Sequence, residues 1–334
     1  MGDPAGIGPE VILKAAAAIA GRRGAPSIIV IGDLRAMQET AARLNKIATP
    51  REWHPGETIP PLAKGVGVLS ISNLSQRAIR PGHPTVEGAG AAYDYVVTGA
   101  RMAMCGEVDA LVTAPISKQW MNRAGHRFPG HTELLAQISR TRLWRMTFAG
   151  GDLTLALVTT HIGLAKVASA LTQRNVFETV NLLATHLRTK FGIAKPRIGV
   201  LGFNPHAGEN GLFGEEEIRV IAPAIRRAQR AGIDAVGPLA PDTAFIRPRG
   251  KFGFDAAVAM YHDQGLIALK TLEFDRAVNV TIGLPFVRTS PDHGTAFEIA
   301  GKGIANPSSM IAAIEYAARA AVAGRESAQR RAAA

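Results

Sequence analysis

The sequence has one cysteine and no long apolar segment. Cys105 is the only cysteine among the 334 residues, which excludes a disulfide framework and every zinc site built from several cysteines. No apolar run reaches the ~18 residues of a membrane-spanning helix, and residues 1–10 lack the basic and apolar segments of a secretory signal. These absences predict a soluble protein of the reducing cytoplasm with no membrane partner.

Compact nucleotide and metal motifs are also absent. There is no GxxxxGK[ST] sequence, so a Walker-type nucleotide site is not predicted. No GxGxxG follows a first strand, so the ordinary dinucleotide fingerprint is missing, and the zinc motif HExxH does not occur either. The sequence therefore offers no compact motif of these three kinds.

Aromatic residues are scarce, whereas positive charge is in excess. Aromatics make up 6% of the residues, and 38 Lys and Arg against 27 Asp and Glu give a net charge of +11. A basic surface attracts anions, but the arginines are dispersed and do not alternate with aromatics. A stacking surface for single-stranded nucleic acid is therefore not predicted. We expect a small anionic substrate and no nucleic-acid partner.

Short apolar runs alternate with longer helical patterns along the chain. Runs rich in Val, Ile and Leu between helices are typical of mostly parallel sheets that are covered on both faces, so the sequence predicts an α/β fold. Its length predicts about two domains, and no Pro/Gly/Ser linker separates two halves, which indicates domains that share the chain discontinuously. The strand-like runs are 27–33, 66–72, 109–115, 153–161, 197–206, 255–263 and 277–283, and the helical stretches are 9–21, 33–45, 177–191, 215–232 and from 306 onward.

The segment "GDPAGIGPE" (2–10) has the pattern of a loop that leads into a helix. Pro9 and Glu10 suit the first helical turn. Such a loop normally follows a strand in an α/β protein, yet only Met1 precedes it. We therefore expect that the chain as given lacks its first strand.

Three strand-like runs end in histidine, at His161, His206 and His262. Ligands bind outside the carboxyl ends of the strands in open α/β sheets, so these side chains can converge. Three neutral imidazoles with one open position are a typical catalytic metal site. The residues alone leave a second interpretation open, in which each histidine bonds to nearby backbone. His54, His83 and His186 lie in loop-like or helical surface contexts and are expected to be ordinary.

Further polar residues are candidates for anion binding. His131 and Thr132 follow Gly130 at a predicted helix start, where backbone N–H groups can hold a phosphate or carboxylate; a plain helix cap is the alternative. Lys270, Asn279 and Arg288 recur at nine-residue intervals after His262 and can together bind an anion. Asp242 follows another strand-like run and is a candidate base or support for a metal ligand.

Several motifs resemble those of known dehydrogenases. The terminal "HGTAFEIAGKGIANPSSM" resembles the adenosine-binding loop of isopropylmalate and isocitrate dehydrogenases, and "GDPAGIGPEV" resembles their first loop. The motifs between them are more specific: "TAPISK", "FPGHTE", "TTHIGL", "NPHAGE", "YHDQGL" and "SPDHGTAF" are similar, in order, to those of the 4-hydroxythreonine-4-phosphate dehydrogenase family. The resemblance covers nearly the whole chain.

The resemblance implies two α/β/α domains of the isocitrate/isopropylmalate dehydrogenase-like type with a cleft between them. Residues 1–125 and 284–334 would form a nucleotide-binding domain, and 126–283 a domain for metal, substrate and dimerisation. It also implies a homodimer with the active site at its interface and metal ligands from both subunits. The implied cofactors are NAD or NADP and one divalent ion per subunit, with zinc first and magnesium or cobalt as alternatives.

The implied reaction is the oxidation of 4-phosphohydroxy-L-threonine followed by loss of CO₂. Related dehydrogenases of 4-phospho-threonate or of aromatic cis-dihydrodiols are alternatives, and a metal-dependent hydrolase is a remote one. By position, the resemblance implies three metal ligands, His161, His206 and His262. It implies substrate contacts from His131, Thr132, Lys270, Asn279 and Arg288, proton transfer by Lys270 or Asp242, and cofactor contacts from Gly294, Thr295, Ala296, Gly301, Gly303 and Asn306.

Overall fold

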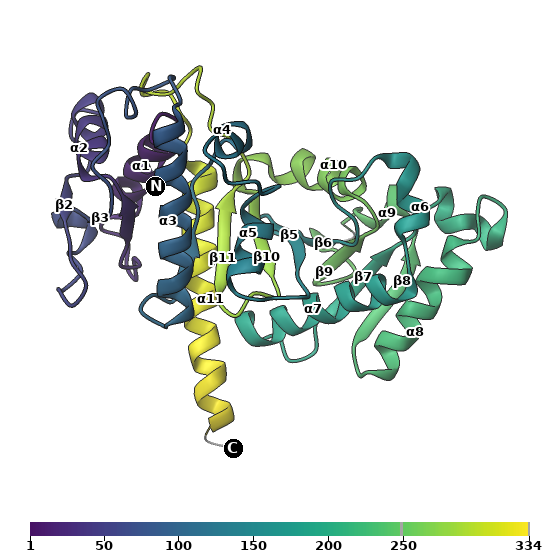
Figure 1. Cartoon of the computed structure of the whole chain (residues 1–334). Helices are drawn as coiled ribbons and strands as arrows, with labels where there is room; N and C mark the ends of the chain where they lie inside the picture. Colours follow the sequence, from purple (N-terminus) through teal and green to yellow (C-terminus); the bar gives the residue numbers. More distant parts are fainter. Residues whose placement is uncertain (248–249, 333–334) are drawn as a thin grey trace. The chain divides into compact units, whose positions relative to one another are not determined.

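The protein is described by a computed structural model that covers residues 1–247 and 250–332. The chain divides into two compact units (Figure 1). Unit 1 comprises Met1–Arg142 and Leu284–Ala318, and unit 2 comprises Leu143–Gly283 and the residues from Arg319 onward. The last two residues of the predicted nucleotide-binding segment, 333–334, lie outside the described residues. Both units combine strands and helices, so the predicted α/β class is confirmed.

Unit 1 contains a small parallel sheet in the order β1-β3-β2 and a parallel pair of β4 with β11. Its apolar core runs from α1 through the small sheet to the start of α11. Side-chain caps define two of its helices, because the first N–H groups of a helix need outside acceptors: Asp33 accepts from Ala36 before α2, and Thr85 accepts from Gly88 before α3. The elements are β1 (Ile29–Gly32), β2 (Pro50–Glu52), β3 (Val66–Ser70), β4 (Ala110–Val112), β11 (Val287–Pro291), α1 (Gly8–Ile19), α2 (Leu34–Arg43), η1 (Leu62–Lys64), α3 (Val86–Met104), α4 (Lys118–Arg123), α5 (His131–Ile138) and α11 (Ser308–Ala332).

Unit 2 contains six strands in the order β10-β5-β6-β9-β7-β8. The pairs β10/β5 and β5/β6 are antiparallel, whereas β6, β9, β7 and β8 are parallel. The sheet is therefore mixed. Its elements are β5 (Arg145–Ala149), β6 (Thr154–Leu157), β7 (Arg197–Leu201), β8 (Asp234–Leu239), β9 (Ala256–Ala259), β10 (Val278–Ile282), η2 (Leu164–Lys166), α6 (Val167–Ala170), α7 (Gln173–Phe191), η3 (Pro205–Gly211), η4 (Glu217–Ile221), α8 (Ala222–Arg230), α9 (Pro241–Ala244), α10 (His262–Glu273) and η6 (Phe274–Arg276).

The central strands of unit 2 are buried on both faces. Leu155, Leu157 and Ala259 form one apolar cluster with Leu266 of α10. Successive strand side chains point to opposite faces, so neighbours such as Ala156 face the other side, where α7 packs across β6, β7 and β9 (Figure 1). This two-sided burial explains why these strands appear in the sequence as continuous apolar runs. Among the described residues, no helix is long and apolar enough to cross a membrane.

Candidate functional site

The three predicted metal ligands follow three neighbouring parallel strands of unit 2. β6 and β7 both pair in parallel with β9, so their carboxyl ends lie at one edge of the sheet. His161 follows β6, His206 lies in η3 after β7, and His262 begins α10 after β9. Adjacent strands are about 5 Å apart, so the fold places all three histidines beyond the same sheet edge.

Two of these histidines lie close together. The ring centroids of His161 and His262 are 5.8 Å apart. The Nδ1 atom of His262 is 2.7 Å from the Asp263 carboxylate, and because a carboxylate only accepts, Nδ1 carries the proton. In the neutral ring this proton position leaves the lone pair on Nε2 of His262, which is the nitrogen that could bind a metal. Asp263, which the sequence left without a role, orients the ring.

His206 is paired differently. Its Nδ1 atom is 3.8 Å from an Asp242 carboxylate oxygen, and both side chains are more than half exposed. Within residues 1–247 and 250–332, the structure has no group of three or more His, Cys, Asp or Glu side chains of one chain arranged to hold a metal ion. The described structure therefore brings His161 and His262 together and leaves His206 with Asp242.

His206 opens an unusual left-handed turn. Residues 206–210 all have positive φ values between 42° and 80°. A left-handed conformation costs roughly 1–2 kcal/mol for each residue other than glycine, and only Gly208 in this turn is a glycine. Such strain persists only where surrounding contacts impose the conformation, so the turn must be anchored from outside.

Glu217 supplies that anchor. Its side chain is 3% exposed, and its carboxylate accepts hydrogen bonds from the backbone N–H groups of Phe203 (2.6 Å) and Asn204 (2.7 Å) and from the Asn204 side chain (2.9 Å). These bonds fix the chain directly before His206. Sequence reasoning missed this residue, because Glu217 appears there only as the third member of the acidic run at 215–217.

The predicted substrate residues of unit 2 lie on α10 and β10. Lys270 is about two helical turns after His262 on α10. Asn279 lies on β10 opposite Phe148 of β5, and its Oδ1 atom is buried with no hydrogen-bond partner. A buried polar atom without a partner costs free energy, so this carbonyl oxygen is a ready acceptor for a donor group of a ligand.

The other predicted substrate residues, His131, Thr132 and Arg288, lie in unit 1. His131 and Thr132 begin α5, while Arg288 lies on β11 and donates to Thr113 Oγ1 at 2.8 Å. Burial, followed by the positive charges of Arg288 and Lys118, holds the pKa of His131 well below its usual value. Its imidazole is therefore neutral at pH 7, and its Nε2 atom is buried without a hydrogen-bond partner.

Arg288 remains positively charged at neutral pH. It is 2% exposed, and burial lowers its pKa to about 10, while Glu133 acts in the opposite direction. A buried guanidinium is stabilised by negative charge close to it. The guanidinium with the nearby ammonium of Lys118 suits an anionic group. Sequence reasoning missed Lys118, although it ends the motif "TAPISK" that carried part of the family resemblance.

The predicted cofactor residues belong to the loop of unit 1 that precedes α11. Gly301 and Gly303 have positive φ, Gly294 is exposed, and the Asn306 side chain caps α11 through Ser308 N–H. Thr295 accepts from Ile7 N–H through its carbonyl, and Ala296 has a φ of 42°. The small residues leave backbone groups accessible to a ligand.

Glu10 and Lys14 of α1 hold this loop in place. Glu10 is 2% exposed and accepts hydrogen bonds from the backbone N–H groups of Gly303 (3.3 Å) and Ala305 (2.9 Å). The Lys14 ammonium donates to the backbone carbonyls of Gly303 and Ala305 and to the Glu10 carboxylate, each at 2.8 Å. Sequence reasoning treated Glu10 only as a first-turn helix residue. The contact between the first and last motifs of the chain is a product of the fold.

His186 differs from the prediction of a surface position. It lies on α7, is 9% exposed, and burial followed by the charge of Lys190 lowers its pKa to about 4. The helical period places this ring against the core. It is a neutral buried side chain rather than a surface one.

Comparisons with known proteins show which family the chain belongs to. The chain matches the model of the family described as "Pyridoxal phosphate biosynthetic protein PdxA" over residues 25–317. It is 44% identical over 325 residues to the 4-hydroxythreonine-4-phosphate dehydrogenase of Maricaulis maris, covering 96% of this chain and 95% of that protein. It is 43% identical over 333 residues to a protein of Bradyrhizobium diazoefficiens provisionally named D-threonate 4-phosphate dehydrogenase, covering 96% and 94%.

A solved structure has the same fold. The crystal structure of 4-hydroxythreonine-4-phosphate dehydrogenase from Klebsiella pneumoniae matches with a TM-score of 0.85 and 39% identity, over 96% of this chain and 98% of that one. The family match spans most of the sequence, and both relatives and this structure align over nearly their whole lengths. The resemblance carried by the motifs is thus confirmed, and the chain belongs to the PdxA family of pyridoxal phosphate biosynthetic proteins.

Proposed function

We propose that the protein is an NAD(P)-dependent dehydrogenase that oxidises 4-phosphohydroxy-L-threonine. The reaction converts the C3 hydroxyl to a ketone, with transfer of a hydride to the dinucleotide and release of a proton. The resulting β-keto acid loses CO₂ to give 3-amino-2-oxopropyl phosphate. The observation that carries this proposal is the placement of His161, His206 and His262 beyond three neighbouring strand ends of unit 2.

The three histidines fit a divalent metal by their donor chemistry. Neutral imidazole nitrogens bind zinc and similar ions, and the bond from His262 to Asp263 leaves Nε2 of His262 available. We propose these three residues as the ligands, with zinc ahead of magnesium or cobalt. When bound, the ion would lower the pKa of the substrate hydroxyl and polarise the carbonyl formed from it.

The remaining residues bind the substrate and move its protons. Arg288 and Lys118 attract the anionic end of the substrate, and the neutral His131 and the hydroxyl of Thr132 contribute further hydrogen bonds. In unit 2, the Asn279 carbonyl oxygen accepts from a donor group of the substrate. Lys270 or Asp242 is the proposed proton-transfer group. It accepts the proton of the substrate hydroxyl during oxidation and returns a proton to the product after CO₂ is lost.

The terminal loop is the proposed contact surface for the adenosine part of NAD or NADP. Its accessible backbone and the anchoring of that backbone by Glu10 and Lys14 support this assignment. When bound, the dinucleotide would accept the hydride. The proposed contacts are Gly294, Thr295, Ala296, Gly301, Gly303 and Asn306.

We further propose a cytoplasmic homodimer in which each metal is held by residues of both subunits. No group of three candidate ligands occurs within the described part of a single chain, and His206 lies with Asp242 rather than with His161 and His262. A partner chain would supply the missing ligand.

A substrate panel tests the function. NADH and NADPH formation is followed with 4-phosphohydroxy-L-threonine, 4-phospho-D-threonate and a cis-dihydrodiol of an aromatic carboxylate, each with and without a chelator. We expect turnover of the first compound, abolished by the chelator and by His206→Ala while the fold stays intact. Turnover that survives both treatments would refute the three-histidine metal site.

A second candidate substrate is 4-phospho-D-threonate, favoured by the 43% identity to the Bradyrhizobium diazoefficiens protein. The two substrates share a phosphate and a secondary hydroxyl, and the amino group distinguishes them. A higher kcat/KM for phosphothreonate in the same panel would replace the first assignment.

A further inference from the structure

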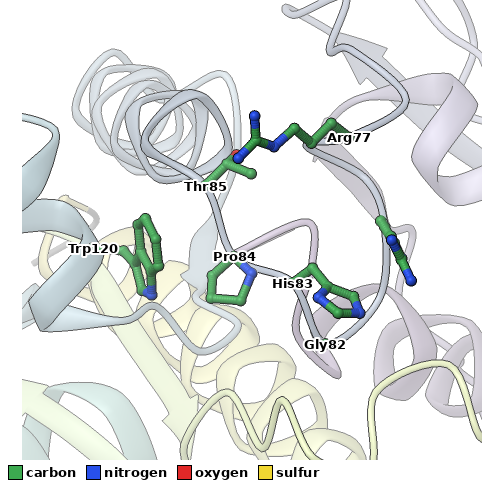
Figure 2. A pocket seen from close by; sticks show the side chains of 7 residues that line it. Arg77, Gly82, His83, Pro84, Thr85 and Trp120 are labelled. Carbon is green, nitrogen blue, oxygen red and sulfur yellow. The ribbon is translucent and has the colours of Figure 1, made fainter.

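Unit 1 contains a cavity that none of the proposed site residues lines. It encloses about 420 Å³ between the end of the 75–85 segment and α4 (Figure 2). This volume lies in the range of roughly 300–1,000 Å³ that is usual for small-molecule sites. Its lining residues are Arg77, Arg80, Gly82, His83, Pro84, Thr85 and Trp120.

The lining is positively charged and contains no carboxylate. Among the described residues, the side chains of Arg77, Arg80 and His83 make no hydrogen bond or ion pair. Two other arginines near this segment are engaged, since Arg43 pairs with Glu39 and Arg35 donates to the Leu74 carbonyl. The two cavity arginines thus keep their donors available for an anion.

The start of α3 adds to the positive potential. Thr85 is the N-cap of this 19-residue helix, and its hydroxyl accepts from Gly88 N–H at 3.0 Å. Helix N-termini carry a partial positive charge that attracts phosphate. The one acidic residue of the first turn, Glu87, is bound by the N–H (2.7 Å) and hydroxyl (2.6 Å) of Ser75. The carboxylate of Glu87 is therefore already hydrogen-bonded to Ser75.

The cavity adjoins the first loop of the chain (2–10) and the terminal loop proposed for the dinucleotide. Gly82 N–H donates to the Ala5 carbonyl at 2.8 Å. A Cβ added to Gly82 would lie 2.9 Å from the Phe297 carbonyl oxygen, and one added to Gly301 would lie 2.7 Å from Pro81. The first loop, the cavity wall and the terminal loop are thus in direct contact, all within unit 1. The wall of the cavity therefore borders the loop proposed to contact the nucleotide.

We propose that this cavity binds phosphate groups of the dinucleotide, with Arg77 and Arg80 as the charged donors. The inference rests on the proposed function, since it names where that function's cofactor is held. The shared chemistry is phosphate, which is present in the pyrophosphate of both cofactors and in the 2′-phosphate of NADP. Arginine is suited to either group, because its planar guanidinium binds phosphate oxygens in a bidentate manner.

The test measures the Kd of the full-length protein for NAD and for NADP by calorimetry, with intrinsic tryptophan fluorescence as a second signal. Arg77→Gln and Arg80→Gln are compared with Arg101→Gln, an exposed arginine in the last turn of α3 that does not line the cavity. Loss of one charge-assisted bond corresponds to about tenfold or more in affinity. We expect at least about a tenfold rise in Kd for each cavity variant and no change for the control.

Comparing the affinity losses for NAD and for NADP shows which phosphate of the dinucleotide the cavity binds. A rise confined to NADP assigns the cavity to the 2′-phosphate, and a rise for both dinucleotides assigns it to the pyrophosphate; either supports the proposal. Unchanged Kd values in both cavity variants overturn it, as does an effect on the KM of the phosphorylated substrate alone. If the unmodified protein binds neither dinucleotide, the proposed function itself fails.

Discussion

Asp263 acquires its role only through one contact. In the sequence it is simply the residue after His262, but its carboxylate lies 2.7 Å from Nδ1 of that ring. The contact selects the tautomer and orients Nε2, as carboxylates do behind many metal-binding histidines. His131 is the opposite case, since burial and neighbouring positive charges keep it neutral without any carboxylate.

Asp263→Asn should therefore weaken metal binding without removing a ligand. An amide can present its NH₂ group to Nδ1 and stabilise the wrong tautomer. We expect the Kd for Zn²⁺ or Co²⁺ to rise about tenfold or more, measured by titration against a competing chelator. Asp275→Asn, an exposed aspartate of η6, is the matched control. Equal affinity of both variants would show that Asp263 does not orient the ligand.

At the level of elements, most strands and helices could be predicted from local pattern. The apolar runs at 66–72 and 277–283 became β3 and β10, and the stretch at 33–45 became α2 with its Asp33 cap. The left-handed turn could not be predicted, because "NPHAGENG" contains only two glycines and its conformation depends on a carboxylate from the next helix. Its anchor is a tertiary contact.

Removing that anchor should destabilise the turn and the protein. Glu217→Ala leaves the Phe203 and Asn204 N–H groups without their acceptor, at a cost of about 1–3 kcal/mol each. We expect the free energy of unfolding in urea to fall by about 2–6 kcal/mol. Metal affinity should fall as well, because His206 lies close behind these residues in the chain.

Glu215→Ala is the control for this experiment. Glu215 pairs with Arg219 at 2.5 Å on the exposed surface, and such pairs contribute about 0–1 kcal/mol. A comparable loss of stability in both variants would mean that Glu217 acts only as a helix residue and does not hold the turn.

At the scale of the whole molecule, buried histidines make stability depend on pH. The folded-state pKa of His186 is lowered from 6.5 to about 4, so between these values the unfolded chain binds more protons than the folded one. Stability is therefore complete above pH 6.5 and declines as the pH falls towards 4. His131 acts in the same direction.

Replacing His186 isolates its contribution to the pH dependence of stability. The free energy of unfolding of the unmodified protein should fall by about 2 kcal/mol more than that of His186→Gln between pH 8 and pH 5. Chemical denaturation at a series of pH values measures this difference. If the two proteins lose stability in parallel, the ring is not held neutral by burial.

Subunit mixing tests the proposed shared metal site. His206→Ala and His262→Ala homodimers should both be inactive, but after unfolding and refolding together the mixed dimers would contain one intact site out of two. Random pairing makes half of the dimers mixed, so about a quarter of the normal activity should return. Activity that stays at zero would contradict a site in which these two ligands come from different chains.

Mixing the remaining pairs shows which chain provides which ligand. Recovery for His161→Ala with His206→Ala means that His161 and His262 act from one chain, in line with their 5.8 Å separation. Recovery for His161→Ala with His262→Ala means instead that His262 is provided by the partner.

The sequence by itself determined the α/β class, the strands that precede the three histidines, and the family through its ordered motifs. These features follow from apolar periodicity and turn chemistry, which act over a few residues. The tertiary structure decided that His262 pairs with Asp263 near His161, that Glu217 and Glu10 anchor distant loops, that His186 is buried, and that Arg77 and Arg80 line a cavity. These features depend on strand order and on packing between segments up to about 300 residues apart, and no local pattern encodes which distant groups will meet.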